Sequence, residues 1–373
     1  MAEPGSTVIT KVRVFDGTSL TEPRDVALDG GLIVASAAAG ATIVDGRGGT
    51  LMPGLIETHA HVDARPALDE LARYGVTTVL DMGCQRPSVI ADLRDTEGRP
   101  DIRTAAAPAT APGSVHVTQM GYPASSALTG ARGARQFVAD QRAHGAAYIK
   151  VILEDAKQPG AKPLPQETVA AVVAAAHDEG LLVVAHAVAA TSYRLACDAG
   201  VDVLTHVPLA EGLTADDAAR LRAGGIVVSP TLTMMDLVAA SLTSDRKYRI
   251  ARRLRLAPAL SIDSAVAAVR LLHEAGVPIL AGTDANADPH APANPPYGVS
   301  LHDELALLVG AGLTPVEALQ AATSTAAQVF GLSDRGQIAA GLRADVILVA
   351  GDPTTDIGAI RAIREVWIGG RRL

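Results

Sequence analysis

Two histidines separated by one residue lie near the end of a predicted buried strand, Leu55–Val62. In a β-strand, residues i and i+2 point to the same face, so His59 and His61 can both face one cavity. Neutral imidazoles are common ligands of zinc and of other divalent transition metals. The same spacing also occurs by chance, so this pair alone is only a weak indication of a metal site.

Four more ionisable residues lie at or near the ends of other apolar runs, and they are Lys150, His186, His206 and Asp284. Burying such groups costs free energy unless they are paired or bind a metal. Taken singly, each of the two histidines could be a core histidine bonded to a backbone carbonyl. The lysine could be an ordinary amine paired with a carboxylate such as Asp284. Their common position at strand ends favours one shared site over these separate explanations.

One unit repeats along the middle of the sequence. In each repeat, a short β-branched apolar run and a loop are followed by an amphipathic helix. Eight such runs can be assigned, at Leu55–Val62, Val76–Gly83, Ile102–Ala107, Ala147–Leu153, Leu182–Val188, Val201–Val207, Ile226–Leu232 and Pro278–Asp284. Helices are expected at Pro66–Tyr74, Ala134–His144, Gln166–Glu179, Ser192–Ala199, Asp216–Ala223 and Ile262–Ala275. Thr214 and Thr314, each followed three residues later by an acidic residue, are predicted N-caps.

Alternating strands and helices are typical of parallel strands joined by right-handed crossovers. Eight of them predict an α/β fold, a closed (β/α)8 TIM barrel, which takes about 250 residues and carries its active site at the carboxyl ends of the strands. A doubly wound open sheet is the alternative. It would usually have a Gly-rich phosphate loop after its first strand, and the sequence has none there.

The two ends of the chain have a different pattern, with short strand-like runs separated by Gly-rich turns. Two or three strands alone are marginally stable, so we expect both ends to pair into one small β-sandwich domain. The predicted division is a β-domain of residues 1–52 and 336–373 beside a barrel of residues 53–335. Two helices, at 300–311 and 315–329, are expected to link the last barrel strand to the β-domain.

The composition of the 373-residue chain excludes several classes of protein. With 48% hydrophobic and 19% charged residues, the chain is too apolar to be intrinsically disordered. A net charge of −8 argues against a nucleic-acid partner, and no apolar run reaches the roughly 18 residues that a membrane span requires. Two cysteines and no secretory pattern at the N-terminus favour a cytoplasmic protein. The oligomeric state stays open, and a homo-oligomer is compatible with the sequence.

The sequence closely resembles the amidohydrolase superfamily of metal-dependent hydrolases over nearly its whole length. The segments that carry the resemblance are Leu51–His61, Ala281–Asp284, Gly312–Leu319 and Gly336–Val349. Within the superfamily, the chain is most similar to the imidazolonepropionase-related group. That group also contains Xaa-Pro dipeptidases and aryl- or acyl-amino-acid amidases.

This resemblance implies a binuclear metal centre with a separate set of ligands for each of two divalent ions. His59, His61 and Asp284 would hold the more buried ion. His186 and His206 would hold the more exposed one. Imidazole and carboxylate ligands suit zinc best, and manganese, cobalt and iron are also compatible with them.

The resemblance further implies that Lys150, carboxylated by CO2, bridges the two ions. Burial lowers the pKa of a lysine, and the neutral amine can then capture CO2. A hydroxide shared by the ions would attack a polarised carbonyl. Asp284 would orient that hydroxide, take its proton and pass the proton to the leaving nitrogen.

Five residues are candidates for contact with the substrate: His116, Tyr122, His290, Tyr297 and His302. The first two lie in the loop after the third predicted strand, and the next two lie in a Pro-rich loop after the eighth. His302 opens the helix that follows that loop. Ordinary packing, or a role as connector, is the alternative for all of them.

The predicted function is hydrolysis of an amide bond in a small-molecule substrate, an N-acyl amino acid or a dipeptide, by a metal-dependent amidohydrolase. A lactone, a cyclic amide or a phosphoester is the alternative substrate at the same site. A non-catalytic scaffold on this fold is the alternative from a different class. The segment Leu153–Gly160 differs from the Gly-rich segment of some dipeptidase relatives, so their substrate is not assigned to this chain.

Overall fold

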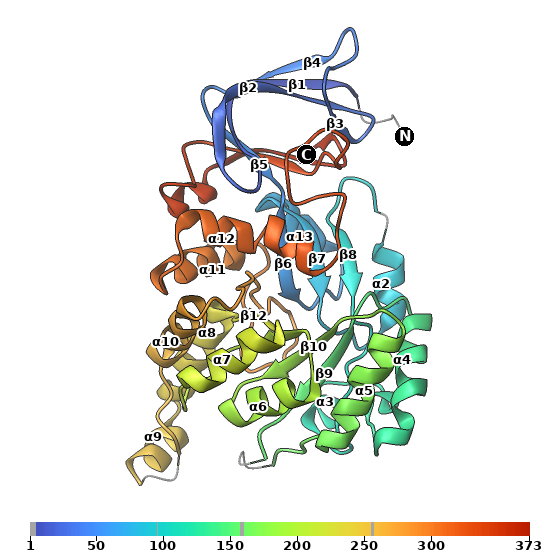
Figure 1. Cartoon of the computed structure of the whole chain (residues 1–373), viewed down its shortest axis with the longest axis vertical. Helices are drawn as coiled ribbons and strands as arrows, with labels where there is room; N and C mark the ends of the chain where they lie inside the picture. The colour runs from blue at the N-terminus through green and yellow to red at the C-terminus, as the bar shows by residue number, and fades with distance from the viewer. Residues whose placement is uncertain (1–4, 95, 157–159, 255–256) are drawn as a thin grey trace.

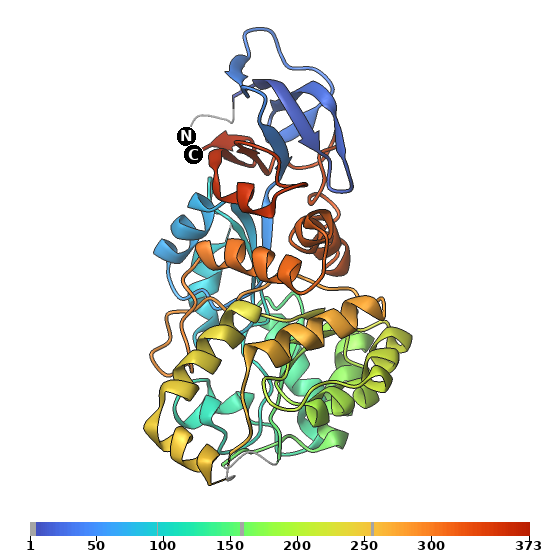
Figure 2. The ribbon, with the colours of Figure 1, turned by 90° about the vertical axis from the view of Figure 1, so that its left-hand side faces the viewer.

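The computed structural model describes residues 5–94, 96–156, 160–254 and 257–373. Figure 1 shows a β-rich part that contains both chain ends and a larger part in which helices surround short strands. Figure 2 shows the same two parts from the side, with the two termini close together.

The β-rich part is one mixed sheet that combines strands from both ends of the chain. Its order is β15-β14-β13-β5-β1-β2-β3, and β4 pairs with β1. The strands are β1 (Thr7–Phe15), β2 (Leu20–Asp29), β3 (Leu32–Val34), β4 (Thr42–Asp45), β5 (Thr50–Pro53), β13 (Val346–Val349), β14 (Ile363–Ile368) and β15 (Arg371–Arg372). The two ends meet where β5 and β13 run antiparallel, with Met52 opposite Ile347.

Alternate residues of this sheet form a separate apolar cluster, which includes Ile9, Val12, Val14 and Trp367. A strand buries every second side chain when one face of its sheet is covered, and this alternation fixes the register. Among the described strands, these eight belong to one hydrogen-bonded sheet, and its hydrogen-bond order does not test how the sheet folds over itself. The sandwich and the exact domain boundaries therefore stay predictions.

The larger part contains seven short strands in two parallel sheets. One has the order β6-β7-β8 and the other the order β12-β11-β10-β9. Their bounds are β6 (Leu55–Ala60), β7 (Val76–Asp81), β8 (Asp101–Thr104), β9 (Ile149–Leu153), β10 (Val183–Ala187), β11 (Val203–Thr205) and β12 (Val227–Ser229). Every pair within these two sheets is parallel, and each strand coincides with one of the predicted runs.

The eighth predicted run, 278–284, is not a regular strand, but it lies between the two sheets. Single parallel bridges join Ile279 to Val228 of β12 and Ala285 to Ala60 of β6. On the opposite side, a single parallel bridge joins Ala109, which follows β8, to Val151 of β9. The ladders are interrupted where Ala106 (φ 54°) and Asp284 (φ 60°) adopt left-handed backbone conformations, which a strand cannot continue through.

The helices cover the outside of these sheets, and the six predicted ones agree with the structure to within two residues. The bounds are α1 (Arg65–Arg73), α2 (Pro87–Leu93), α3 (Val115–Thr118), α4 (Ala134–Ala143), α5 (Gln166–Asp178), α6 (Ala190–Ala199), α7 (Ala215–Gly224), α8 (Leu232–Ser244), α9 (Arg246–Arg253), α10 (Ile262–Glu274), α11 (Val299–Gly310), α12 (Pro315–Ala321) and α13 (Ser324–Val329), with 3-10 turns at Ala124–Ser126, Ala131–Gly133 and Ile357–Arg361. Both predicted N-caps are present, because Thr214 and Thr314 each form a capping box.

The predicted helix at 315–329 is divided into α12 and α13. The carbonyl of Ala321 accepts a hydrogen bond from Ala281 N, and the carbonyl of Ala322 accepts one from Ile56 N. Because these carbonyls bond to the strand region, they are not available to continue a single helix. The break therefore ties these helices to the first and last of the predicted barrel strands.

A buried cation joins the end sheet to the parallel sheets. The side chain of Arg335 is only 4% exposed, and its guanidinium lies 2.8 Å from Asp101 of β8 and 4.0 Å from Asp345 beside β13. It also donates to the hydroxyl of Thr78 on β7. A buried guanidinium is stabilised by such carboxylates and acceptors, so this contact fixes how the two parts of the molecule pack together.

None of the helices in the described part of the chain is long and apolar enough to span a membrane.

Candidate metal centre

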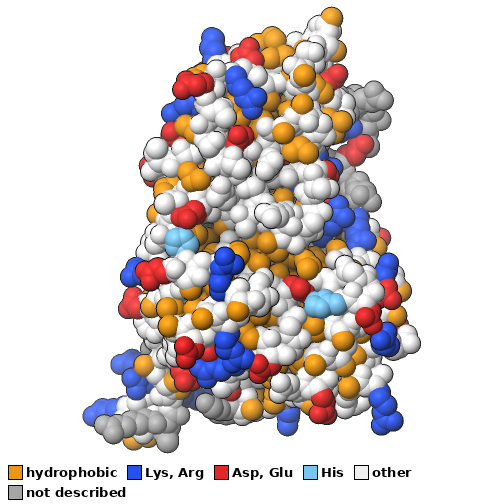
Figure 3. All heavy atoms as spheres, in the orientation of Figure 1, with side chains coloured by type: hydrophobic (Ala, Val, Ile, Leu, Met, Phe, Trp, Pro, Cys, Tyr) orange, Lys and Arg blue, Asp and Glu red, His pale blue; other side chains and the backbone are white. Residues whose placement is uncertain are grey.

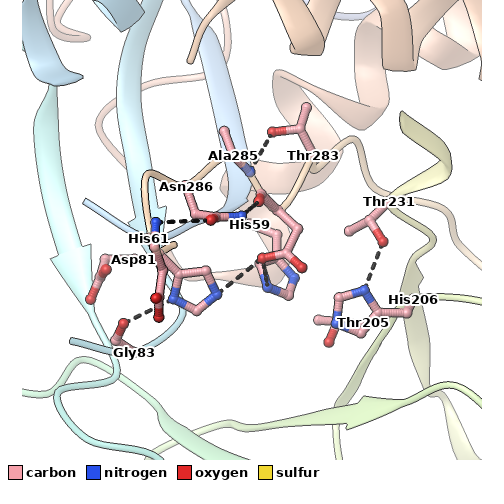
Figure 4. A network of polar contacts seen from close by, with 12 residues as sticks. His59, His61, Asp81, Gly83, Thr205, His206, Thr231, Thr283, Ala285 and Asn286 are labelled. Atoms are coloured by element: carbon pink, nitrogen blue, oxygen red, sulfur yellow. Dashed lines mark hydrogen bonds and ion pairs between the residues drawn. The ribbon is translucent and has the colours of Figure 1, made fainter. Parts of the chain in front are cut away.

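The first two histidines of the predicted site lie beside one carboxylate. His59 belongs to β6, and His61 follows the last residue of that strand. The Nε2 atoms of His59 and His61 lie 3.4 Å and 3.0 Å from Oδ1 of Asp284. Figure 4 shows the rings of His59 and His61 close together, with Thr283 and Ala285, around the end of the irregular eighth run, beside them.

The other two histidines approach from the neighbouring sheet. His186 belongs to β10, and His206 follows β11 directly. The ring centroids of His186 and His206 are 4.5 Å apart, and those of His206 and His59 are 4.9 Å apart. Potential ligand atoms of His59, His206 and Asp284 all lie within 4.8 Å of one another. The structure thus brings four imidazoles and one carboxylate into a single group.

Lys150 lies on β9 and is almost completely buried, with 2% of its surface exposed. Its Nζ donates a hydrogen bond to Oγ1 of Thr205, at 2.8 Å. Burial lowers the pKa of this lysine to about 7, although the charge of Asp284 acts in the opposite direction. In the described part of the chain, no ion pair joins Lys150 to a carboxylate, so the salt bridge considered from the sequence is not formed.

The site is arranged to keep three of the four imidazoles neutral and the carboxylate charged, whereas the hydrogen bond and charge of Asp284 raise the pKa of His61 against the effect of burial. Burial, together with the charge of Lys150, lowers the pKa of His59 to about 3. Burial also lowers the pKa of His186 and of His206 well below the usual value. Burial alone would raise the pKa of Asp284, but the adjacent imidazoles hold it well below its usual range. Neutral rings with free lone pairs beside an ionised carboxylate form a donor set that suits a divalent cation.

One buried atom supports this assignment independently. Among the residues that the structure describes, Nδ1 of His59 has no hydrogen-bond partner, although the residue is 1% exposed. Leaving a buried polar atom unpaired costs about 1–3 kcal/mol. The ring of His59 lies 5.5 Å from that of His61 and 4.9 Å from that of His206, beside the carboxylate of Asp284, as expected where a bound cation would compensate for the unpaired atom.

Local backbone geometry helps to bring the side chains together. His206 and Asp284 have φ angles of 72° and 60°, which are uncommon for residues with a Cβ atom. Such conformations cost about 1–3 kcal/mol and cluster at functional sites. Gly282 allows the chain before Asp284 to approach β6, because a Cβ there would lie 2.7 Å from Thr58 Oγ1 and 2.8 Å from His59 Cβ.

The buried carboxylate of Glu57 joins the two strands that carry the first ligand set. It accepts hydrogen bonds from the backbone N–H of His59 at 2.9 Å and from that of Thr283 at 3.0 Å. The hydroxyl of Thr283 donates to the same carboxylate at 2.8 Å. Sequence reasoning missed this residue, although a charged residue two positions before His59 on the same strand face was a usable signal.

The remaining imidazoles are held by backbone and hydroxyl partners. Nδ1 of His61 lies 2.9 Å from the carbonyl of Gly83, and Nδ1 of His206 lies 2.8 Å from Oγ1 of Thr231. Asp81, at the end of β7, accepts a hydrogen bond from Val62 N beside the site. None of these supporting residues carries a recognisable sequence signal, since each acts through a contact between distant segments.

Three of the five candidate substrate contacts lie beside this group. The ring of His116 is 6.4 Å from that of His186 and 6.4 Å from that of Tyr122. Tyr122 donates to the carbonyl of Gly83, and Tyr297 donates to the carbonyl of His61. These two tyrosines therefore border the first ligand pair.

The other two candidates are not brought to the group in the same way. His290 is exposed in the loop after Asp284, where its backbone N–H bonds to Asp288. His302 is buried, and its Nε2 lies 2.9 Å from the carbonyl of Tyr74. Tyr74 precedes β7, at the amino end of that strand, whereas the metal-ligating candidates lie at the carboxyl ends. Packing against α1 therefore accounts for His302.

Residues 50–373 match the sequence profile of the amidohydrolase family. The chain belongs to the amidohydrolase family. It is 28% identical over 361 residues to an uncharacterised protein of Mycobacterium tuberculosis, a match that covers 92% of this chain and 90% of the relative. It is 30% identical over 208 residues to an imidazolonepropionase of Deinococcus deserti, which covers 54% of this chain and 44% of that protein.

Among solved structures, this amidohydrolase superposes on a Xaa-Pro dipeptidase with methionine bound in the active site. The TM-score is 0.83 at 24% identity, with 99% of each chain covered. At that level of identity the likeness concerns the fold. Family membership identifies the chain as a hydrolase of the amidohydrolase superfamily.

Proposed function

We propose that this amidohydrolase cleaves an amide C–N bond of a small molecule, an N-acyl amino acid or a dipeptide, in a reaction that depends on two divalent metal ions. The observation that carries the proposal is the buried convergence of His59, His206 and Asp284, whose potential ligand atoms lie within 4.8 Å of one another. His61 and His186 extend the group on either side.

The proposed fold around this site is a closed eight-stranded barrel. The single bridges at Ile279, Ala285 and Ala109 support it, because they join the free edges of the two parallel sheets. The carboxyl ends of barrel strands converge on one rim, where enzymes of this fold carry their active sites.

In the proposed site, His59, His61 and Asp284 would hold one ion, and His186 and His206 would hold the other. Lys150, carboxylated by CO2, would provide a further anionic ligand. The lowered pKa of Lys150 supports this role, since only the neutral amine captures CO2 and the new N–C bond releases one proton. Zinc is the ion that imidazole and carboxylate ligands suit best.

Bound zinc ions would polarise a carbonyl and lower the pKa of water to about 7. Asp284 then acts as the proton shuttle, taking a proton from the attacking water and giving it to the leaving nitrogen. Its low pKa keeps it ionised and able to accept the proton. His116, Tyr122 and Tyr297 border the space in which the substrate would lie, and His290 belongs to the loop that follows Asp284.

The assignment of an amide substrate is supported by the names of similar proteins. One solved structure is named a Xaa-Pro dipeptidase, and one relative is named an imidazolonepropionase. Metal sites of this kind also serve other electrophiles, because the loops around a common fold select the substrate. Lactones and phosphoesters are therefore included in the test.

A substrate panel tests the proposal. The zinc-loaded protein is assayed with N-acyl amino acids, Xaa-Pro dipeptides, cyclic amides, lactones and phosphotriesters, alongside Asp284→Asn and the surface control Asp178→Asn. We expect an amide to be the best substrate, the first variant to lose activity and the control to retain it. Preference for a cyclic amide, a lactone or a phosphotriester would contradict the assignment. Full activity of Asp284→Asn would contradict the mechanism.

A further inference from the structure

The ring of His206 is fixed through the nitrogen that faces away from the shared group. Its Nδ1 lies 2.8 Å from Oγ1 of Thr231, and both residues are buried, at 2% and 0% exposure. Figure 4 shows this contact at the edge of the site opposite His61. With Nδ1 engaged by the hydroxyl, Nε2 is the ring nitrogen left to bind a metal.

Thr231 makes this contact from a strained backbone. It has φ 50° and ψ 48°, in the left-handed region that β-branched residues rarely adopt. Such a conformation persists only where surrounding contacts over-determine it. Thr231 lies between the end of β12 and the start of α8, so contacts that fix the first turn of α8 also fix the orientation of its side chain.

A carboxylate from a distant helix supplies these contacts. Glu304 on α11 is completely buried, and it accepts hydrogen bonds from the backbone N–H of Leu232 at 2.9 Å and of Thr233 at 2.7 Å. The hydroxyl of Thr233 donates to the same carboxylate at 2.9 Å. The first N–H groups of a helix have no partner within it, and a negative charge is favoured at that end.

We propose that Thr231 and Glu304 are positioning residues for His206: the carboxylate holds the start of α8, and the threonine hydroxyl then fixes the tautomer and direction of the imidazole. This inference rests on the proposed function, in which His206 is a ligand of the second ion. In the tautomer that binds metal through Nε2, the Nδ1–H donates to Thr231 Oγ1. Outer partners of this type typically change metal affinity by about 10–100-fold.

The alternative is that Glu304 only caps α8 and that Thr231 only fills space. Both roles would reduce stability on substitution, so stability does not separate them. Metal affinity and the tautomer of the His206 ring do distinguish the two explanations, because a residue that only caps α8 or fills space changes neither of them.

The decisive variant is Thr231→Val, which keeps the shape of the side chain and removes the hydroxyl. The dissociation constants of both zinc ions are measured by competition with a chromogenic chelator. The tautomer of His206 is read in the metal-free protein by 15N NMR. Thr231→Ser restores the hydroxyl, and Thr243→Val is the matched control, because Thr243 also belongs to α8 but bonds only to backbone carbonyls of its own helix.

We expect Thr231→Val to raise the dissociation constant of one of the two zinc ions by about 10–100-fold and to leave that of the other almost unchanged. Thr231→Ser should regain the lost affinity, and Thr243→Val should match the wild type. Glu304→Gln should weaken the binding of the same ion. The N–H groups of Leu232 and Thr233 bond to different oxygens of Glu304, so the NH2 group of a glutamine would face one of these donors and accept nothing from it. Asp303→Asn, a neighbour on α11 whose carboxylate pairs with Arg361 at the surface, should have no effect.

Unchanged affinity for both ions in Thr231→Val would overturn the positioning role while leaving the proposed function standing. If the wild-type protein binds no zinc, the proposed function fails, and the NMR measurement then decides the positioning role alone. In that case a His206 ring with the proton on Nδ1 in the wild type and a mixture of tautomers in Thr231→Val supports it. The same tautomer in both proteins rejects it.

Discussion

The carboxylate of Glu57 and the hydroxyl of Thr283 form a buried hydrogen bond of 2.8 Å between residues 226 positions apart. The same carboxylate accepts the backbone N–H of His59. Because Thr283 precedes Asp284, this one side chain connects both segments of the first ligand set. The distance between His59 and Asp284 is therefore fixed by backbone contacts as well as by the side chains themselves.

Glu57→Gln should disturb this connection with little change in volume. Its amide oxygen can still accept the two backbone N–H groups, which share Oε1, but its NH2 group then stands where Oε2 accepted the hydroxyl of Thr283, and losing a buried hydrogen bond in this way costs about 1–3 kcal/mol. We expect lower stability in urea unfolding and a lower zinc content after dialysis. The exposed Glu179→Gln is the control and should change neither quantity. A variant that unfolds and binds zinc as the wild type does would show that the connection is dispensable.

Asp284→Asn should reduce kcat by about 10²–10⁴-fold, the range typical for loss of a general acid–base group. The amide oxygen still permits some metal binding, so the zinc content should fall much less than kcat does. The measurement is steady-state kinetics on the best amide substrate together with elemental analysis of the same sample. Parallel loss of zinc and activity would instead assign Asp284 a purely structural role.

Reconstitution of the stripped protein should depend on bicarbonate and on pH. Burial lowers the pKa of Lys150 from 10.5 to about 7, so the neutral amine that captures CO2 becomes more abundant as the pH rises through 7. Recovery of activity with zinc and bicarbonate should therefore be greater at pH 8 than at pH 6. Lys150→Met should not respond to bicarbonate at either pH. Equal recovery without bicarbonate would argue against a carboxylated lysine.

The position of the candidate site could be predicted because its ligands end apolar runs that are readable in the sequence. His186 and His206 end short apolar runs, and parallel strands bring their carboxyl ends together. The irregular eighth run was not predictable, since it depends on the left-handed conformation of Asp284. The roles of Thr231 and Glu304 were also hidden, because they arise from the packing of α11 against the start of α8.

The stability of the packing between the end sheet and the parallel sheets should depend on Arg335. Replacing it with methionine leaves Asp101 paired with Arg103 and Asp345 paired with Arg343, but it removes the buried guanidinium and its hydrogen bond to Thr78, so we expect a loss of about 1–3 kcal/mol. Chemical unfolding measures this loss. Arg135→Met is the control, because its pair with Asp178 is exposed and such pairs contribute about 0–1 kcal/mol. Equal effects of the two substitutions would contradict the assigned role of Arg335.

The pH dependence of stability should include a contribution from Asp217. The hydrogen bond from Arg194 lowers the pKa of this carboxyl from 3.8 to about 2, against the effect of burial. A lowered pKa stabilises the folded protein above the unfolded-state value, and this contribution is lost as the pH falls from 3.8 through 2. Asp217→Asn should thus destabilise the protein at pH 7 by about 1 kcal/mol and much less near pH 2. A difference that is independent of pH would contradict the pairing.

The most direct test of the account is a zinc titration of the chelator-stripped protein, with bicarbonate present, while hydrolysis of its best amide substrate is followed. We expect no activity in the stripped protein and a rise in activity that reaches its plateau at two equivalents of zinc per chain. Full hydrolysis by the stripped protein, with no change on adding zinc, would contradict the proposed function.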